Sequence, residues 1–175
     1  ADWEGVPFRE VAASGLIKEQ TVINHQLGNV AATAPNEMIL EAAMKQREVM
    51  VQHYATHSKK KINPLVLIQL PSDAKSLSDL DKSIRSEVET YLKTQGITYD
   101  NGKLGIWLAD AKSKINLDGI EELDNEVEYL IFKQAIALGW DCPRACILVM
   151  FRDIKSTSFK LQTVGRILRM PEASH

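Results

Sequence analysis

The sequence of 175 residues has only two cysteines, Cys142 and Cys146, with no histidine close to them. A structural zinc ion takes four ligands, so this C-x-x-x-C spacing does not supply a zinc site by itself. A disulfide between the two remains an alternative. Reduced, packed thiols in a cytoplasmic protein are the expectation for so low a cysteine content.

Long apolar runs are also missing. No stretch reaches the roughly 18 apolar residues of a membrane-spanning helix, and residues 1–5 contain neither a basic nor an apolar signal segment. The sequence therefore predicts no contact with a membrane and a cytoplasmic location.

The sequence lacks the phosphate-binding loop of a complete ATPase, G-x-x-x-x-G-K-[ST]. The nearest approach runs from Gly96 to Lys103, where five residues separate the glycines and Leu104 replaces the hydroxyl. The sequence also has no G-x-G-x-x-G, which a Rossmann-type enzyme needs after its first strand. Both absences argue against a self-contained nucleotide-dependent enzyme.

The net charge is −2, so no overall basic character indicates a nucleic-acid partner. The charges are nevertheless unevenly distributed. Residues 117–128 include six acids and no base, whereas residues 133–169 include seven bases against Asp141 and Asp153. The basic part is suited to phosphate groups, but a solvated basic face explains the same charges equally well.

Short β-rich runs alternate with segments of helical periodicity, which predicts an α/β fold with a mostly parallel sheet flanked by helices. The continuous apolar runs are typical of strands buried on both faces. Helices are expected at 36–57, 78–94 and 159–170, one or two helical turns at 135–138, and strands at 65–70, 104–109, 128–132 and 146–151.

The last of these helices carries the most distinctive pattern. At about 100° per residue, Gln162, Arg166 and Arg169 share one face, and Gly165 lets another surface approach closely. Two guanidiniums without an acidic neighbour repel one another unless they share an anion, and arginine suits phosphate oxygens. A solvated polar face is the competing interpretation.

A second candidate follows the strand at 128–132. Lys133, Gly139 and Asp141 come after its carboxyl end, where open α/β sheets bind ligands. An ordinary loop is the alternative for this segment.

Gln162, Gly165, Arg166 and Arg169 together resemble motif VI of superfamily-two helicases, and the stretch 133–141 resembles their motif V. More narrowly, residues 132–145 and 162–172 resemble the Res subunit of type III restriction enzymes, which are ATP-dependent DNA translocases. Residues 63–73 resemble the motif IV region, and residues 14–18 resemble the start of this domain in that family.

The resemblance implies a RecA-like, P-loop NTPase-like domain without its own P-loop. Residues 1–35 would be a linker from a first motor domain, and residues 36–175 the second motor domain. Arg166 and Arg169 would act as arginine fingers on the γ-phosphate, with Gln162 touching the same phosphate or its attacking water.

The resemblance also implies binding roles. Gly139, Asp141 and Gly165 would border the nucleotide, and Lys133, Gln134 and Gln69 would contact nucleic acid. Lys133 stands where motif V usually has a threonine, which is a departure from the family pattern.

The implied cofactors are ATP and Mg²⁺, held mainly by the first motor domain, so this chain alone would be inactive. The implied partners are double-stranded DNA, the preceding motor domain, a following nuclease domain and a modification methyltransferase subunit. The alternative is a nucleic-acid or subunit docking module with the same fold and no catalytic role.

Overall fold

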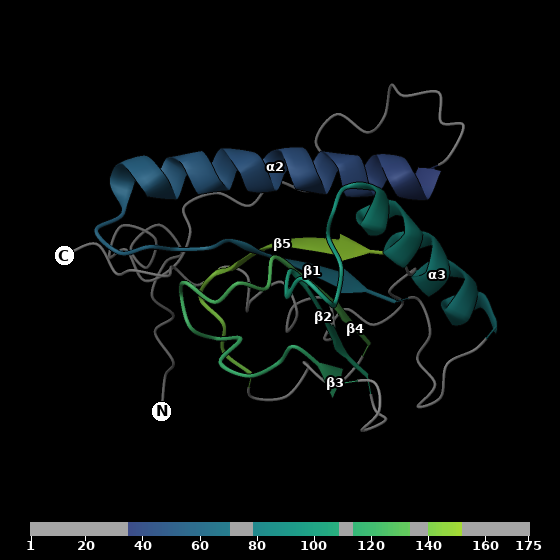
Figure 1. The fold of residues 1–175 in the computed structure, drawn as a ribbon. Coiled ribbons are helices and arrows are strands. Elements are labelled where there is room, and N and C mark those ends of the chain that lie inside the picture. Colours follow the sequence, from purple (N-terminus) through teal and green to yellow (C-terminus); the bar gives the residue numbers. More distant parts are fainter. Residues whose placement is uncertain (1–34, 71–78, 109–113, 134–139, 152–175) are drawn as a thin grey trace, which may run out of the picture.

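The computed structural model describes residues 35–70, 79–108, 114–133 and 140–151 (Figure 1). The elements in these ranges are helices α2 (Pro35–His57) and α3 (Asp79–Thr94), and strands β1 (Leu65–Gln69), β2 (Leu104–Trp107), β3 (Lys114–Ile115), β4 (Tyr129–Phe132) and β5 (Ala145–Met150). The helix expected at 159–170 and the turns expected at 135–138 lie outside the described residues.

The five strands form one sheet in the order β3-β2-β4-β1-β5. Strands β1, β2, β4 and β5 are parallel to one another, and β3 is antiparallel to the end of β2. The predicted α/β class with a mostly parallel sheet is therefore confirmed. The sequence did not predict β3, which has only two residues and is set by its pairing with β2.

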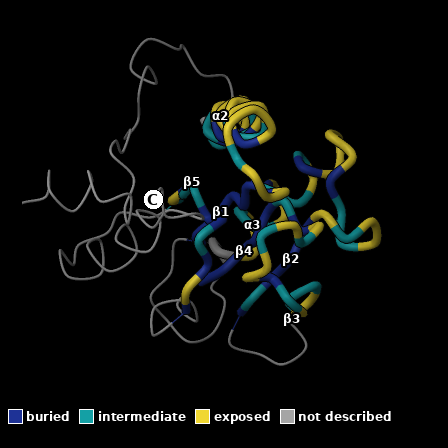
Figure 2. Tube along the Cα trace, turned by 90° about the vertical axis from the view of Figure 1, so that its left-hand side faces the viewer, coloured by how far each residue is buried: buried dark blue, intermediate teal, exposed yellow. Residues whose placement is uncertain are grey.

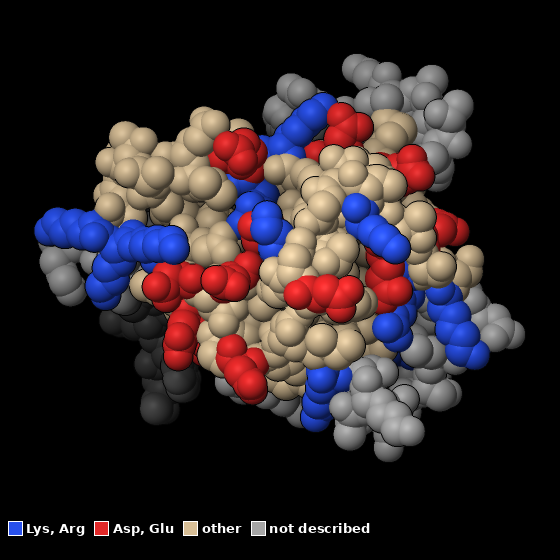
Figure 3. Space-filling model, in the orientation of Figure 1, with Lys and Arg blue, Asp and Glu red and all other residues tan. Residues whose placement is uncertain are grey.

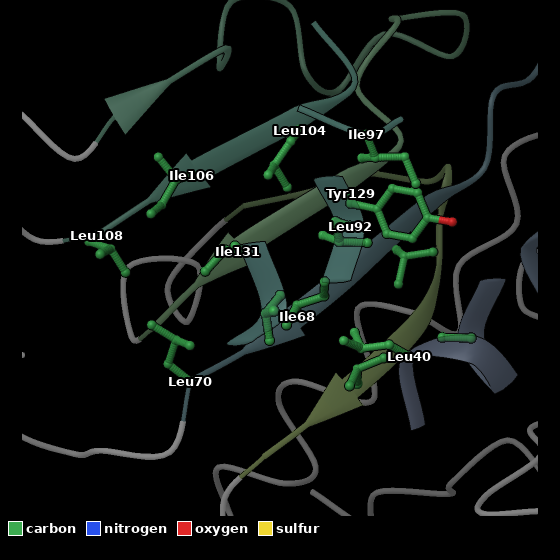
Figure 4. Packing of buried hydrophobic residues seen from close by; sticks show 14 residues of the cluster. Leu40, Ile68, Leu70, Leu92, Ile97, Leu104, Ile106, Leu108, Tyr129 and Ile131 are labelled. Atoms are coloured by element: carbon green, nitrogen blue, oxygen red, sulfur yellow. The ribbon is translucent and has the colours of Figure 1, made fainter. Parts of the chain in front are cut away.

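Both helices cover the same face of the sheet. Leu40 and Ala43 of α2 and Val88 and Leu92 of α3 pack onto alternate strand residues such as Ile68. Figure 4 shows this core from close by, with side chains of β1, β2 and β4 meeting those of the helices. In Figure 2 strands β1 and β4 are buried along their length, while the outer side of α2 is exposed. The helices thus provide one complete layer of an α/β fold.

Within the described part of the chain, irregular segments cover the other face of the sheet. Ile120 and Val127, from the segment between β3 and β4, pack there with Trp140 and Cys142, from the connection between β4 and β5. The strand residues in this second core alternate with those of the first core: in β1, Leu65 and Leu67 point to this face, whereas Ile68 points to the helices. β1 is therefore buried on both faces, as its continuous apolar sequence predicted.

The helical periodicity of the sequence places Ile39, Ala43, Met50 and Tyr54 on one face of α2. Ala43 and Tyr54 are buried and Ile39 and Met50 half-buried, and Leu40 and Arg47 are buried as well. Arg47 was not expected there because a charged side chain is normally at the surface. Its hydrogen bonds, described below, make its burial possible.

No disulfide joins Cys142, which is buried, and Cys146, which is half-buried, so the prediction of thiols without a disulfide is confirmed. Across the described ranges, neither helix combines the length and apolar character needed to span a lipid bilayer.

Candidate functional site

The chain leaves two neighbouring strands in opposite directions. From β1 it passes through α3, on the helix-covered face, to β2; from β4 it returns past Trp140 and Cys142, on the opposite face, to β5. β1 and β4 are adjacent, so their carboxyl ends define a topological switch point of the sheet (Figure 1). Open α/β sheets bind ligands in the crevice at such a point.

Two of the residues predicted to contact nucleic acid lie at this switch point. Gln69 is the last residue of β1, and Lys133 directly follows β4. The amide of Leu70 donates to the main-chain oxygen of Phe132 at 3.0 Å, which joins the two strand ends. The structure therefore brings Gln69 and Lys133 to the same end of adjacent strands, called the carboxyl end of the sheet below.

Gln69 has no exposed surface, and neither Oε1 nor Nε2 of its side chain has a hydrogen-bond partner among the residues that the structure describes. Leaving a buried polar group unpaired costs roughly 1–3 kcal/mol. Core packing alone does not require this loss of stability, because a methionine or leucine would fill similar space without an unpaired polar group. An uncompensated amide at the end of a central strand is typical of a functional position.

Gln69 belongs to a row of side chains that crosses the carboxyl end of the sheet. Its register partners are Phe132 in β4 and Met150 in β5, and Phe132 is in turn paired with Trp107 of β2. Trp107 is half-buried and Met150 is 37% exposed, so the row approaches solvent on both sides of Gln69. Apart from the amide, every side chain of this row is aromatic or apolar.

Asp141 lies between two buried residues, of which Trp140 reaches this row. The indole of Trp140 donates to Glu121 Oε1 at 2.6 Å and packs edge-on against Trp107, with ring centroids 6.0 Å apart. Cys142 is buried in the second core, whereas Asp141 between them is exposed. The predicted nucleotide-bordering carboxylate is therefore fixed at the surface by buried residues on both sides.

Burial also sets the protonation of the Cys142 thiol. Removal from water raises its pKa to about 11, although the nearby guanidinium of Arg144 acts in the opposite direction. A thiol with so high a pKa carries little nucleophilic thiolate near neutral pH. Cys142 is thus a packing residue and not a nucleophile.

The opposite, amino end of the sheet is tied together by two buried arginines that the sequence did not single out. Arg144 is fully buried and donates to main-chain oxygens of Asn63, Ile120 and Val127 at 2.8–2.9 Å. Burial lowers its pKa from the usual value. These acceptors satisfy the guanidinium, so this arginine serves the fold and not ligand binding.

Arg47 forms the second tether. It donates from Nε to the main-chain oxygen of Pro64 at 2.9 Å and from Nη2 to the side chain of Asn63. Its Nη1 lies 3.5 Å from Glu128, and its guanidinium lies over the ring of Tyr129. α2 is thereby fixed to the starts of β1 and β4.

An open hollow of about 710 Å³ lies at this amino end, beside the end of α2. Lys59, Lys60 and Lys61 line one part of it, and Asp124 and Glu126 another. Figure 3 shows basic side chains at this end of the helix with acidic ones next to them. The triple lysine suits the negative end of the α2 dipole, which explains it without a ligand.

The remaining predicted site residues lie outside the described residues, so they stay predictions. They are Gln134, Gly139, Gln162, Gly165, Arg166 and Arg169.

Comparison with known proteins found no matching family model, no matching curated protein and no matching solved structure.

Proposed function

We propose that this chain is the second RecA-like motor domain of an ATP-dependent DNA translocase, of the kind found in the Res subunit of type III restriction enzymes. Its support is the helicase-like sequence at residues 133–141 and 162–169, together with the mostly parallel α/β sheet. The observation that carries the proposal is the meeting of Gln69 and Lys133 at the switch point between β1 and β4.

The proposal assigns separate tasks to the chain's own residues. Lys133 supplies a positive charge for a DNA phosphate at the carboxyl end of the sheet. Asp141, exposed beside Trp140, borders the nucleotide. Arg166 and Arg169 present their guanidiniums to charge that develops on the γ-phosphate, a role worth roughly 10³–10⁵ in turnover where arginine fingers act.

ATP and Mg²⁺ belong in this proposal to a preceding domain. The sequence has no phosphate-binding loop, and within the described ranges no group of three or more His, Cys, Asp or Glu side chains is arranged to hold a metal ion. ATP supplies the chemical energy for movement along DNA. This chain contributes the guanidiniums and the DNA-facing end of the sheet, so we expect no hydrolysis by it alone.

The test uses the longer protein that contains this chain and its preceding motor domain. Arg166→Ala should lower ATP turnover at least about 10³-fold while DNA binding is retained. Lys45→Ala, on the exposed side of α2, is the matched control and should change neither property. Unchanged turnover in Arg166→Ala, or robust hydrolysis by the 175-residue chain alone, would refute the proposal.

A docking module with the same fold is the second candidate, and the hollow at Lys59–Lys61 favours it because the basic and acidic side chains that line it suit a charged partner surface. The same variant distinguishes the two. If Arg166→Ala weakens DNA binding and reduces its salt dependence while ATP turnover persists, the docking role is the correct one.

A further inference from the structure

We infer that Gln69 recognises the hydrogen-bonding edge of a nucleobase, most simply adenine, at the carboxyl end of the sheet. This inference rests on the proposed function and adds a base contact to its phosphate contacts. The starting observation is the side-chain amide of Gln69, which is completely buried and has no hydrogen-bond partner among the described residues.

The chemistry of the amide defines the class of ligand. A glutamine side chain presents one acceptor and two donors in a single plane. The amino group and adjacent ring nitrogen of adenine present the complementary donor and acceptor, which is why Asn and Gln pair with adenine in two places at once. A bare phosphate offers acceptors alone and leaves the amide oxygen unsatisfied.

The surroundings of Gln69 fit a base better than a phosphate. Its register partners Phe132 and Met150 are apolar, and Trp107 continues the same row. Flat aromatic and apolar side chains bind the faces of bases. Lys133, which is 4% exposed, follows the adjacent strand at the same end of the sheet.

Gln69 has no exposed surface. A base reaches its amide only when the side chains that bury it move aside, so ligand binding and this movement are one coupled event. The amide then gains partners that it lacks in the free chain. This explains why a residue unfavourable for the stability of the free chain occupies the central strand.

Gln69→Met separates stability from binding, because methionine has a similar length and volume but no amide. The unfolding temperature of the 175-residue chain should rise by roughly 2–8 °C, since the unpaired polar group is removed. Leu67→Met, on the same strand and face, is the control for a new thioether in this core and should not raise it. A lower unfolding temperature for Gln69→Met would show that the amide is paired in the free chain, which overturns the inference.

Binding is then measured by calorimetry with adenosine, short oligo-dA and ribose 5-phosphate. The wild-type chain should bind adenosine or oligo-dA, and Gln69→Met should bind it about 10- to 100-fold more weakly. Binding of adenosine alone identifies a free nucleotide as the source of the base, and binding of oligo-dA alone identifies a DNA strand.

Three results overturn the inference: no binding of either base-containing probe, equal binding by Gln69→Met, or equally tight binding of ribose 5-phosphate. None of them bears on ATP turnover in Arg166→Ala, so failure of the base contact and failure of the motor proposal remain distinguishable.

Discussion

The guanidinium of Arg144 donates from Nη1 to the main-chain oxygen of Asn63, 81 residues earlier in the chain, at 2.9 Å. The same Asn63 uses its side-chain oxygen to accept a bond from Arg47 and its side-chain amide to donate to Asn125. Asn63, two residues before β1, therefore links α2, the residue that precedes β5 and the segment that precedes β4. These contacts fix the amino end of the sheet.

Arg144→Met should destabilise the chain by about 3 kcal/mol or more. The substitution leaves the main-chain oxygens of Ile120, Val127 and Asn63 buried without their donor. Urea unfolding measures the change, and Lys45→Met on the exposed side of α2 is the control, expected within about 0.5 kcal/mol of wild type. A loss below about 1 kcal/mol for Arg144→Met would contradict the assigned role.

Asn116 combines a left-handed backbone, with φ of 56°, and two hydrogen bonds from its side-chain amide to the oxygens of Tyr99 and Leu104, both 2.8 Å. Asn116→Ala loses both bonds and keeps the backbone strain, so we expect a loss of about 2–4 kcal/mol. Asn116→Gly loses the bonds but relieves the strain. Chemical denaturation should show the glycine variant to be about 1 kcal/mol more stable than the alanine variant, and the reverse order would be inconsistent with this account.

The raised pKa of the Cys142 thiol leads us to expect that the chain loses stability in alkaline solution. The pKa of this thiol rises from 9.0 in the unfolded chain to about 11 in the fold, because burial disfavours the thiolate. The stabilisation is fully present below pH 9 and is lost as pH rises towards 11, by roughly 2–3 kcal/mol in total. Unfolding free energies measured across this range test it. Cys142→Ala should reduce the loss of stability between pH 9 and pH 11, whereas Cys146→Ala should leave that loss unchanged.

A phosphate contact of Lys133 should contribute to the salt dependence of DNA binding. If Lys133 contacts a phosphate, Lys133→Met should weaken binding of unrelated DNA sequences equally and reduce the slope of log affinity against log salt by about 1. Fluorescence anisotropy at several salt concentrations measures the slope, with Lys60→Met as the control at the opposite end of the sheet. Because Lys133 is only 4% exposed, the unfolding temperature should be measured in parallel. An unchanged slope with an intact fold would remove Lys133 from the DNA contact.

Much of the fold could be predicted from the sequence because the buried strands are continuous runs of mostly apolar residues. The strand Leu65–Gln69 is buried at every position and apolar up to Ile68, and α3 has a regular apolar face that includes Val88 and Leu92. Neither β3 nor the burial of Arg47 and Arg144 could be predicted in this way. A two-residue strand depends on its partner, and a buried guanidinium depends on oxygens brought together only in the folded chain.

The candidate site was predictable in part for a similar reason. Parallel strands place their carboxyl ends together, so a residue that follows one buried strand is expected near the end of its neighbour, as Lys133 and Gln69 are. The sequence alone does not reveal that the amide of Gln69 is buried without a partner among the described residues, because this depends on tertiary packing. The roles of Arg166 and Arg169 remain predictions from their sequence pattern.

The two arginine tethers and the uncompensated glutamine lie at opposite ends of the same strands. Random mutagenesis should therefore distinguish two kinds of polar position: substitutions of Asn63 or of the two arginines reduce the yield of folded protein, whereas apolar replacement of Gln69 spares or improves it. Selection for expression alone would consequently replace Gln69 first, because the chain becomes more stable when its unpaired amide is removed.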